Sequence, residues 1–342
     1  MAKMWAGRTD GATDRLADDF AFIKKQGVFI FMGLVLMIGV SMQSLRTIRR
    51  LAVFGFLCAF AGVVLTYVVG DATKGAARWI KFAGFSLQPS EFIKPVFIVV
   101  TAWLLDANKR IEDFPGMTLA VGLFLLTALS VFGQPDLGMT VLISGVWALQ
   151  MVWAGIPVWL IMTLFSAGLV LVTGSYFFLA HVRDRIDRFL ASENEIGSQI
   201  QKSMDAFANG NLLGRGPGEG YVKMTLPDVH TDFIFALAGE ECGVWLTTII
   251  VAAFAAIVVR SMTLSMRDNN LFVMYAASGL AASLGGQAIV NMCSALQLMP
   301  AKGMTLPFVS YGGSSMLASC LAMGMLLAIT RKNAAAEDKD NG

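Results

Sequence analysis

A polar stretch at the start of an apolar run holds the densest group of side chains that can do chemistry. The stretch runs from Thr225 to Gly243 and reads TLPDVHTDFIFALAGEECG. Its ionisable residues are Asp228, His230, Asp232, Glu240 and Glu241. Ionisable groups at the mouth of a membrane helix are costly and tend to be kept for chemistry or transport. We therefore take this stretch as the centre of a candidate site.

The amino-acid composition indicates an integral membrane protein. Of the 342 residues, 56% are hydrophobic and 15% are charged, which is more apolar than a soluble domain that must cover its surface with charge. The formal net charge of +2 is too small to indicate a nucleic-acid partner. With only two histidines, His181 and His230, a histidine-built zinc site is not expected. The sequence also shows no P-loop, Rossmann glycine pattern or Ser/His/Asp set, so the function classes built on those motifs are not expected.

The elements that must position these side chains are apolar helices. A membrane helix needs about 20 apolar residues to cross a hydrocarbon core of about 30 Å. The sequence has runs that approach or reach this length at 26–45, 51–70, 92–105, 117–132, 139–155, 157–180, 243–259, 271–298 and 308–330. We predict an all-α, polytopic membrane protein with about nine transmembrane helices. It divides into a polar tail (1–22), a membrane domain (23–332) with a long outer loop (181–242), and a polar cytoplasmic tail (333–342).

The positions of lysine and arginine indicate the orientation of these spans. Short cytoplasmic loops carry an excess of both residues, so the basic turn at 46–50 is expected inside. Strict alternation then also places these residues inside: Lys109, Arg110, Arg260, Arg267, Arg331 and Lys332. The connections 71–91, 181–242 and 299–307 fall on the outer face, and so does the N-terminus.

The first outer connection combines cations with an aromatic ring. Arg78 either offers positive charge to an anionic substrate or anchors the chain at the membrane interface beside Trp79. Glu91 and Lys94 lie three residues apart, so they share one helical face. They form either a structural ion pair or a site in which Glu91 holds Lys94 for an anionic substrate.

Two other outer connections carry signals of their own. Asp136, in the turn Gln134-Pro135-Asp136, is expected to cap the helix that follows. The connection at 181–242 far exceeds the usual length, which suggests a binding or catalytic element. Its residues Arg183, Arg185 and Arg188 are expected on a short surface helix that contacts either lipid phosphates or substrate.

The last outer connection is predicted to be bent and non-helical. Residues 299–315 read MPAKGMTLPFVSYGGSS, with Lys302 between two prolines. At membrane depth such backbone is tolerated where it is buried in protein or lines a wet cavity. Its small residues either pack helices or allow close approach of a ligand, and helix packing explains Lys302 poorly. The candidate binding residues here are Lys302, Ser310, Tyr311, Gly312 and Ser314.

Four sets of motifs occur in the order and spacing of a known family. They are KGAARWI with QPSEF, then QPDLG, LPDVHTDFIFALAGEECG and MPAKGMTLPFVSYGGSS. On these motifs the chain resembles the SEDS family (shape, elongation, division and sporulation) over about residues 22–332. The last motif is similar to that of the division members rather than the elongation members. The resemblance implies a ten-helix fold with both termini cytoplasmic, and because the segment before Phe22 does not look like the family's first helix, we expect that helix to be missing here.

The resemblance implies a glycosyltransferase that polymerises peptidoglycan glycan strands from lipid II during septal cell-wall synthesis. A sugar hydroxyl of one lipid-linked disaccharide attacks the anomeric carbon of another, and undecaprenyl diphosphate leaves. This reaction needs a base and positive charge at the diphosphate. Asp232 matches the family's catalytic aspartate in HTDFIF, and the implied substrate-binding residues are Arg78, Trp79, Glu91, Lys94, His230, Lys302, Ser310, Tyr311, Gly312 and Ser314. No cofactor and no dedicated metal ligands are expected, although the diphosphate leaves room for a divalent cation.

The resemblance also implies partners and a location. These are a class B penicillin-binding protein and other division proteins, in the bacterial inner membrane at the division septum, with the active face extracytoplasmic. Two other function classes stay open on the sequence. A flippase for lipid II would need polar groups at both faces and midway. A non-enzymatic scaffold of division proteins would leave Asp232 and Lys302 unexplained.

Overall fold

Nine long helices make up most of the part of the chain that the structure describes. This computed structural model describes residues 24–69, 71–73, 76–82, 85–134, 136–178, 180, 182–184, 187, 199–221, 230–299 and 303–331. The long helices are Lys24–Ser41, α2 (Leu45–Val69), α3 (Pro89–Arg110), α4 (Gly116–Gly133), α5 (Leu137–Trp153), α6 (Val158–Phe178), α9 (Ile234–Met266), α10 (Leu271–Ala295) and α11 (Gly313–Thr330). They follow the predicted apolar runs in order. The predicted tails 1–22 and 333–342 lie outside the described residues.

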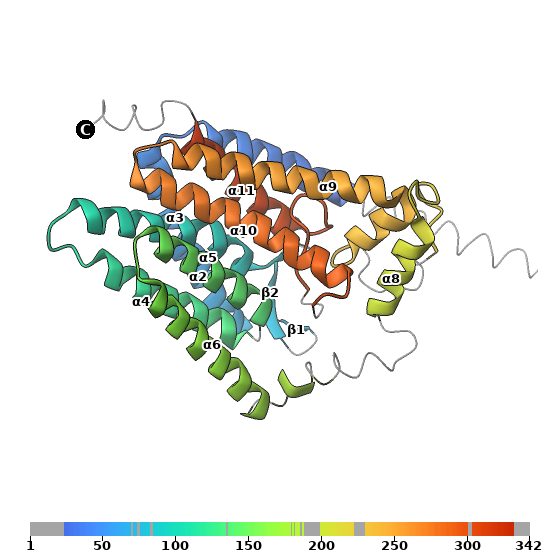
Figure 1. Ribbon diagram of the computed structural model, residues 1–342, viewed down its shortest axis with the longest axis horizontal. Helices are drawn as coiled ribbons and strands as arrows, with labels where there is room; N and C mark the ends of the chain where they lie inside the picture. Colours follow the sequence, from blue (N-terminus) through green and yellow to red (C-terminus); the bar gives the residue numbers. More distant parts are fainter. Residues whose placement is uncertain are drawn as a thin grey trace, which may run out of the picture.

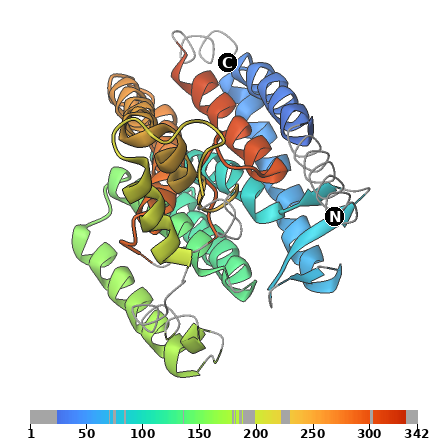
Figure 2. The ribbon, with the colours of Figure 1, turned by 90° about the vertical axis from the view of Figure 1, so that its right-hand side faces the viewer.

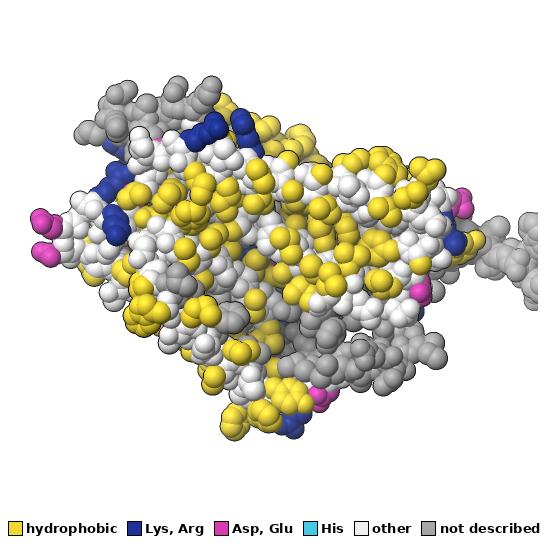
Figure 3. Space-filling model, viewed as in Figure 1, with side chains coloured by type: hydrophobic (Ala, Val, Ile, Leu, Met, Phe, Trp, Pro, Cys, Tyr) yellow, Lys and Arg dark blue, Asp and Glu magenta, His cyan; other side chains and the backbone are white. Residues whose placement is uncertain are grey.

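The helices have the length and surface of membrane spans. Six of the described helices are long and apolar enough to cross a membrane, namely Lys24–Ser41, α2, α4, α9, α10 and α11. α3 is equally long at 22 residues but contains Glu91, Lys94 and Asp106. On the face in Figure 3, hydrophobic side chains cover most of the middle of the molecule, and charged side chains lie mostly toward its ends. The prediction of a polytopic membrane protein is confirmed.

The two ends of the helix bundle differ in their connections. Brief turns at 42–44, 111–115, 154–157 and 267–270 join the helices at one end, which we call the short-turn end. The other end, which we call the long-connection end, carries three short strands, α8 (Gln199–Gly210) and the segment 303–312. The short-turn end lies on the left of Figure 1, and Figure 2 turns the long-connection end toward the reader.

Three strands replace part of the loop predicted at 71–91. β1 (Asp71–Thr73), β2 (Ala76–Phe82) and β3 (Phe85–Leu87) pair antiparallel in the order β1-β2-β3. The strands are too short to leave a clear alternating pattern in the sequence. They end where α3 begins at Pro89, a residue suited to the first helical position because its missing N–H is not needed there.

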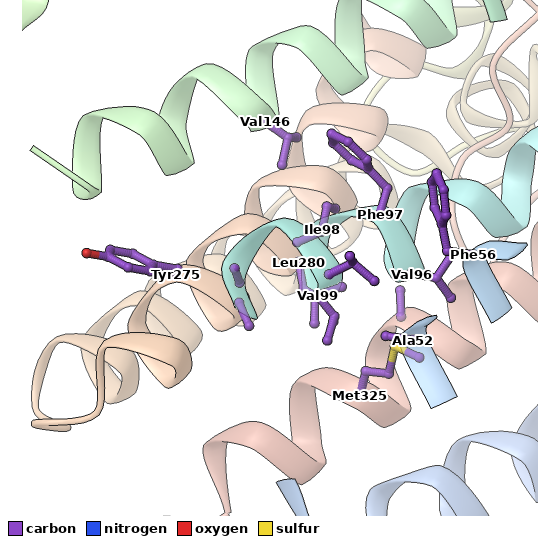
Figure 4. Packing of buried hydrophobic residues seen from close by; sticks show 14 of the residues in the cluster. Ala52, Phe56, Val96, Phe97, Ile98, Val99, Val146, Tyr275, Leu280 and Met325 are labelled. Carbon is purple, nitrogen blue, oxygen red and sulfur yellow. The ribbon is translucent and has the colours of Figure 1, made fainter. Parts of the chain in front are cut away.

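α3 and α10 form the centre of the bundle. Most residues of both helices are buried, and α3 packs against α2, α4, α5, α10 and α11. Figure 4 shows apolar side chains from these elements meeting, including Phe97 and Ile98 of α3, Leu280 of α10 and Met325 of α11. The central helices therefore give a fixed frame for polar side chains that project from them.

α9 is broken near the long-connection end. Gly243 has φ 81° and ψ −177°, which interrupts the helix. The carbonyls of Glu240 and Glu241 instead accept hydrogen bonds from the backbone N–H groups of Arg215 (3.0 Å) and Gly216 (2.9 Å). The span predicted at 243–259 therefore begins at the break, and α9 continues for nine further residues toward Asp232, from Cys242 back to Ile234.

Candidate active site

Asp232 lies in a short turn just before α9. The turn spans residues 230–233, and Phe233 is the N-cap residue of the helix. The Asp232 side chain is partly exposed, and an added Cβ on Gly303 would lie 3.6 Å from its Oδ2 atom. Gly303 has a left-handed φ of 64°, a conformation that suits glycine. The carboxylate thus sits beside bent backbone of the 303–312 segment.

The 303–312 segment is bound to this turn by backbone contacts. The N–H of Tyr311 donates to the carbonyl of His230 at 2.8 Å. The buried Ser310 hydroxyl donates to the carbonyl of Thr231 at 2.5 Å and accepts from the N–H of Leu306 at 2.8 Å. His230, Asp232, Ser310 and Tyr311, all predicted from the sequence, are therefore brought together.

A buried ion pair lies on α3. Lys94 Nζ donates to Glu91 Oε2 at 2.7 Å, and the two residues are 5% and 6% exposed. Lys94 Nζ also donates to Oε1 of Gln287 on α10. The structural ion pair, one of the two sequence interpretations, is present, and contact of Lys94 with substrate stays a prediction.

Arg78 is tied to the helix-end turn at 134–136. Its Nε donates to the carbonyl of Gln134 at 3.0 Å, and its Nη1 lies 3.3 Å from Asp136 Oδ2. Asp136 also accepts from the N–H of Met139 at 3.2 Å, so the predicted cap of α5 is present. Arg78 thus fastens β2, which also carries the partly buried Trp79, to the start of α5.

Ser314 joins β3 to the start of α11. Its hydroxyl accepts from the N–H of Gln88 and donates to the carbonyl of Ser86, both at 3.0 Å. Gly312 is the N-cap residue of α11, and its carbonyl accepts the first helical hydrogen bond, from Met316. In this arrangement both residues support the fold at the long-connection end, and contact with substrate stays a prediction.

Comparison with known proteins identifies the family. Residues 9–335 match the cell cycle protein family that groups FtsW, RodA and SpoVE. The chain belongs to this family. It is 42% identical to the probable peptidoglycan glycosyltransferase FtsW of Caulobacter vibrioides, over 92% of this chain and 81% of that protein. It is 36% identical to the FtsW of Geobacter metallireducens that carries the same name, over 94% of this chain and 88% of that protein.

Solved structures of the family share the fold. A chain from a peptidoglycan synthase complex that coordinates polymerization and crosslinking superposes with a TM-score of 0.77 at 27% identity, covering 92% of this chain and 91% of that one. The rod shape determining protein RodA of Thermus thermophilus gives a TM-score of 0.65 at 25% identity, covering 91% of this chain and 88% of that one. The resemblance to the SEDS family, and to its division members in particular, is confirmed.

Several predicted positions of this SEDS chain lie outside the described residues. They are Lys302, Asp228, His181, Arg185 and Arg188. Arg183 is described and exposed, at the end of the bundle where α6 ends. In the described part of the chain, no three His, Cys, Asp or Glu side chains are grouped so that they could hold a metal ion. The divalent cation stays a prediction.

Sequence reasoning missed two amide residues of the candidate site. Gln287 and Asn291 lie four residues apart within the apolar run 271–298, on the same face of α10. Polar side chains inside a membrane helix face protein partners or cavities, so this pair was a readable signal. Both bind backbone atoms of the 303–306 region, at Thr305 and Met304.

Proposed function

We propose that this chain is a glycosyltransferase that polymerises peptidoglycan glycan strands from lipid II in septal cell-wall synthesis, with Asp232 as the general base. The position of Asp232 is the observation that supports this most directly. Its partly exposed carboxylate lies at the long-connection end beside Gly303, on backbone fixed by buried polar side chains. A general base needs an accessible carboxylate held in a defined place, and this turn supplies one.

The reaction requires one proton transfer and one displacement. Asp232 takes the proton of a sugar hydroxyl on one lipid-linked disaccharide, and the oxygen attacks the anomeric carbon of another. The new glycosidic bond forms as the bond to the diphosphate breaks, so undecaprenyl diphosphate carries away the electron pair. Positive charge near the diphosphate lowers the barrier to its departure.

Two described cations at this end of the bundle already face carboxylates. Lys94 pairs with Glu91, and Arg78 pairs with Asp136. A diphosphate would have to compete with these carboxylates for either cation. Lys302 precedes Gly303 in the sequence and is our candidate for the diphosphate, supported by the position of Gly303 beside the Asp232 carboxylate.

We place the long-connection end on the extracytoplasmic side of the bacterial inner membrane. The short-turn end carries the basic residues Arg46, Arg49, Arg50, Lys109, Arg110 and Arg267, as expected for cytoplasmic ends. Lipid II polymerised at the outer face would meet a class B penicillin-binding protein and other division proteins at the septum. The peptidoglycan synthase complex that contains a similar chain supports such a partner.

Cysteine labelling tests this orientation. In a background with the four native cysteines replaced by serine, Glu219→Cys should react with an impermeant maleimide on intact spheroplasts, and Glu112→Cys should react only after lysis. Both positions are exposed, one at each end of the bundle. The reverse pattern would place Asp232 on the cytoplasmic side and refute the proposal.

A polymerisation assay tests the catalytic assignment. Purified chain and its penicillin-binding partner, given labelled lipid II, should form glycan strands. Asp232→Asn should lower the rate by about 10²- to 10⁴-fold, the usual effect of removing a general base. Glu219→Gln, an exposed carboxylate at the same end, is the matched control and should keep the rate.

The same preparation separates the other function classes. Vesicles loaded with labelled lipid II report its movement between leaflets. If the chain transports lipid II but forms no polymer, it is a flippase. If it binds its partner but shows no transport and no polymerisation, it is a scaffold. Equal rates for wild type and Asp232→Asn would remove Asp232 as the base.

A further inference from the structure

We propose that Gln287 and Asn291 of α10 are positioning residues that set the place of Asp232 relative to Lys94. The two amides form a bridge from the ion pair on α3, through the 303–306 segment, to the turn that carries Asp232. The inference rests on the proposed function of Asp232. In it, the two amides are the rigid support that fixes the position of the Asp232 carboxylate.

Asn291 holds two separate backbone segments with one amide group. Its Nδ2 donates to the carbonyl of Asp232 at 2.9 Å and to the carbonyl of Met304 at 2.7 Å. The side chain is 1% exposed. An amide NH₂ has two donors, and here each donor has its own carbonyl. A single nitrogen therefore ties the Asp232 turn to the segment containing Gly303, in addition to the contacts of Ser310 and Tyr311 with the same turn.

Gln287 makes the matching contacts one helical turn away. Its Nε2 donates to the carbonyl of Thr305 at 2.9 Å and to the Thr305 hydroxyl at 3.3 Å. Its Oε1 accepts from Lys94 Nζ. Because the ammonium can only donate, it fixes which way the amide points. Lys94 thus orients Gln287, and Gln287 orients the 303–306 segment.

α10 is suited to carry this bridge. The helix is buried along most of its length against α3, α5, α9 and α11, so its side chains project from a fixed frame. Residues four apart lie on the same helical face, which places both amides against one segment. A displacement of about 1 Å at a reacting group can cost about 10²-fold in rate, so a rigid support for Asp232 has catalytic value.

A second amide in the bundle provides a matched control. Gln150 of α5 is 0% exposed, and its Nε2 donates to the carbonyls of Ile98 (2.9 Å) and Tyr275 (3.2 Å). In the described part of the chain, Gln150 Oε1 and Asn291 Oδ1 both have no hydrogen-bond partner. The two amides thus do the same structural work, but Gln150 binds only helix backbone away from Asp232.

The experiment compares Asn291→Leu with Gln150→Leu in the full chain with its partner. Each change removes two amide–carbonyl hydrogen bonds and puts an apolar side chain in the place of the amide. We expect Asn291→Leu to lower kcat for lipid II polymerisation by about 10- to 100-fold with little change in KM. Its acid limb in the pH–rate profile should also shift, because the carboxylate leaves its place beside Gly303. Gln150→Leu should change kcat less than about threefold, and Asn291→Gln, which keeps the amide, should recover part of the loss.

Hydrogen exchange measures the bridge without any activity. Asn291→Leu should speed exchange of the amides at 306 and 311, whose hydrogen bonds join the 303–312 segment to itself and to the Asp232 turn. Gln150→Leu should leave them protected. If exchange is unchanged, or if it rises while kcat and the pH profile stay as in wild type, the proposal is overturned. If wild type forms no polymer, the proposed function fails, and the exchange result still decides whether the bridge exists.

Discussion

The two ends of the helix bundle differ in the contacts that hold their connections. At the short-turn end, two of these contacts are local: Asn270 Oδ1 accepts from the N–H of Phe272 at 3.1 Å, and Arg110 pairs with Asp106 one turn earlier on α3 at 2.8 Å. Arg110 also donates to Asn270 Oδ1 at 2.9 Å, which joins the turn before α10 to the end of α3. At the long-connection end, Ser310 binds backbone 79 residues away and Ser314 binds backbone 226 residues away. Local contacts close a turn, whereas long-range contacts fix one segment against another. The second kind is what a catalytic carboxylate on a turn requires.

The ion pairs at the two ends give the largest expected contrast. Lys94→Met leaves the buried Glu91 carboxylate without its ammonium and the Gln287 Oε1 without a donor. Breaking a buried pair in this way costs about 3–5 kcal/mol. Arg110→Met should cost less, about 1 kcal/mol, because the Arg110 side chain is 50% exposed, although its partner Asp106 is buried.

Thermal unfolding in detergent measures both variants. A Glu91→Gln change added to Lys94→Met removes the unpaired charge and should recover part of the loss. If Lys94→Met were no more destabilising than Arg110→Met, the Glu91–Lys94 pair would not differ in stability from the half-exposed Asp106–Arg110 pair, and the contrast between the ends would fail there.

Part of this contrast could be predicted from the sequence because it depends on local rules. The Asp136 cap and the Glu91–Lys94 spacing each involve residues within a few positions of one another. The positions of the nine long helices in the described part of the chain followed from length and composition alone. The prediction of a basic turn at 46–50 was wrong in its position: α2 begins at Leu45, so the three arginines lie in the first turns of that helix.

The rest could not be predicted because it depends on which distant segments meet. Substrate binding by Ser310 stays a prediction, and the sequence did not show that its hydroxyl joins Leu306 to Thr231. Gln287 and Asn291 were visible as amides in an apolar run, but nothing local shows that they hold the 303–306 region. The start of α9 was missed because Glu240, Glu241 and the break at Gly243 interrupt the apolar run, although Phe235 and Ala236 before them are buried in hydrophobic clusters.

Two glycines with positive φ, one near each end of the bundle, give an intermediate expected difference in stability. At Gly243 (φ 81°) a Cβ would overlap backbone atoms of Leu212 and Gly214, so neither side can yield cheaply. At Gly155 (φ 88°), in the turn 154–157, nothing lies within 4 Å of the added atom. We expect Gly243→Ala to cost about 3 kcal/mol and Gly155→Ala about 1–2 kcal/mol, the strain of the backbone alone.

Unfolding midpoints and polymerisation rates test this pair together. Gly243→Ala should also lower activity. The added methyl group would push away the backbone of residues 211–216, which contacts α9 near the turn that carries Asp232. Gly155→Ala should keep its activity per folded molecule. Equal losses of stability would mean that the approach of residues 211–216 to the break in α9 is loose.

The smallest expected difference in stability is between a serine at the long-connection end and an asparagine at the short-turn end. Ser310→Ala leaves the N–H of Leu306 and the carbonyl of Thr231 without their shared hydroxyl, at a cost of about 1–3 kcal/mol. Asn270→Ala removes the α10 cap and a hydrogen bond from Arg110, at about 1 kcal/mol. The free energies are close, so stability alone does not distinguish the ends.

Activity distinguishes the two variants, because Ser310, unlike Asn270, binds the turn that carries Asp232. Measured on equal amounts of folded protein, polymerisation by Ser310→Ala should fall about tenfold, and that by Asn270→Ala should match wild type. Ser310→Thr keeps a hydroxyl at the same position and should restore most of the rate. If Ser310 instead contacted substrate directly, the added methyl group of threonine would crowd the substrate and the rate would stay low. If Ser310→Ala and Asn270→Ala were equally active, the long-range contacts at Ser310 would serve folding alone, and the position of Asp232 would depend on Asn291.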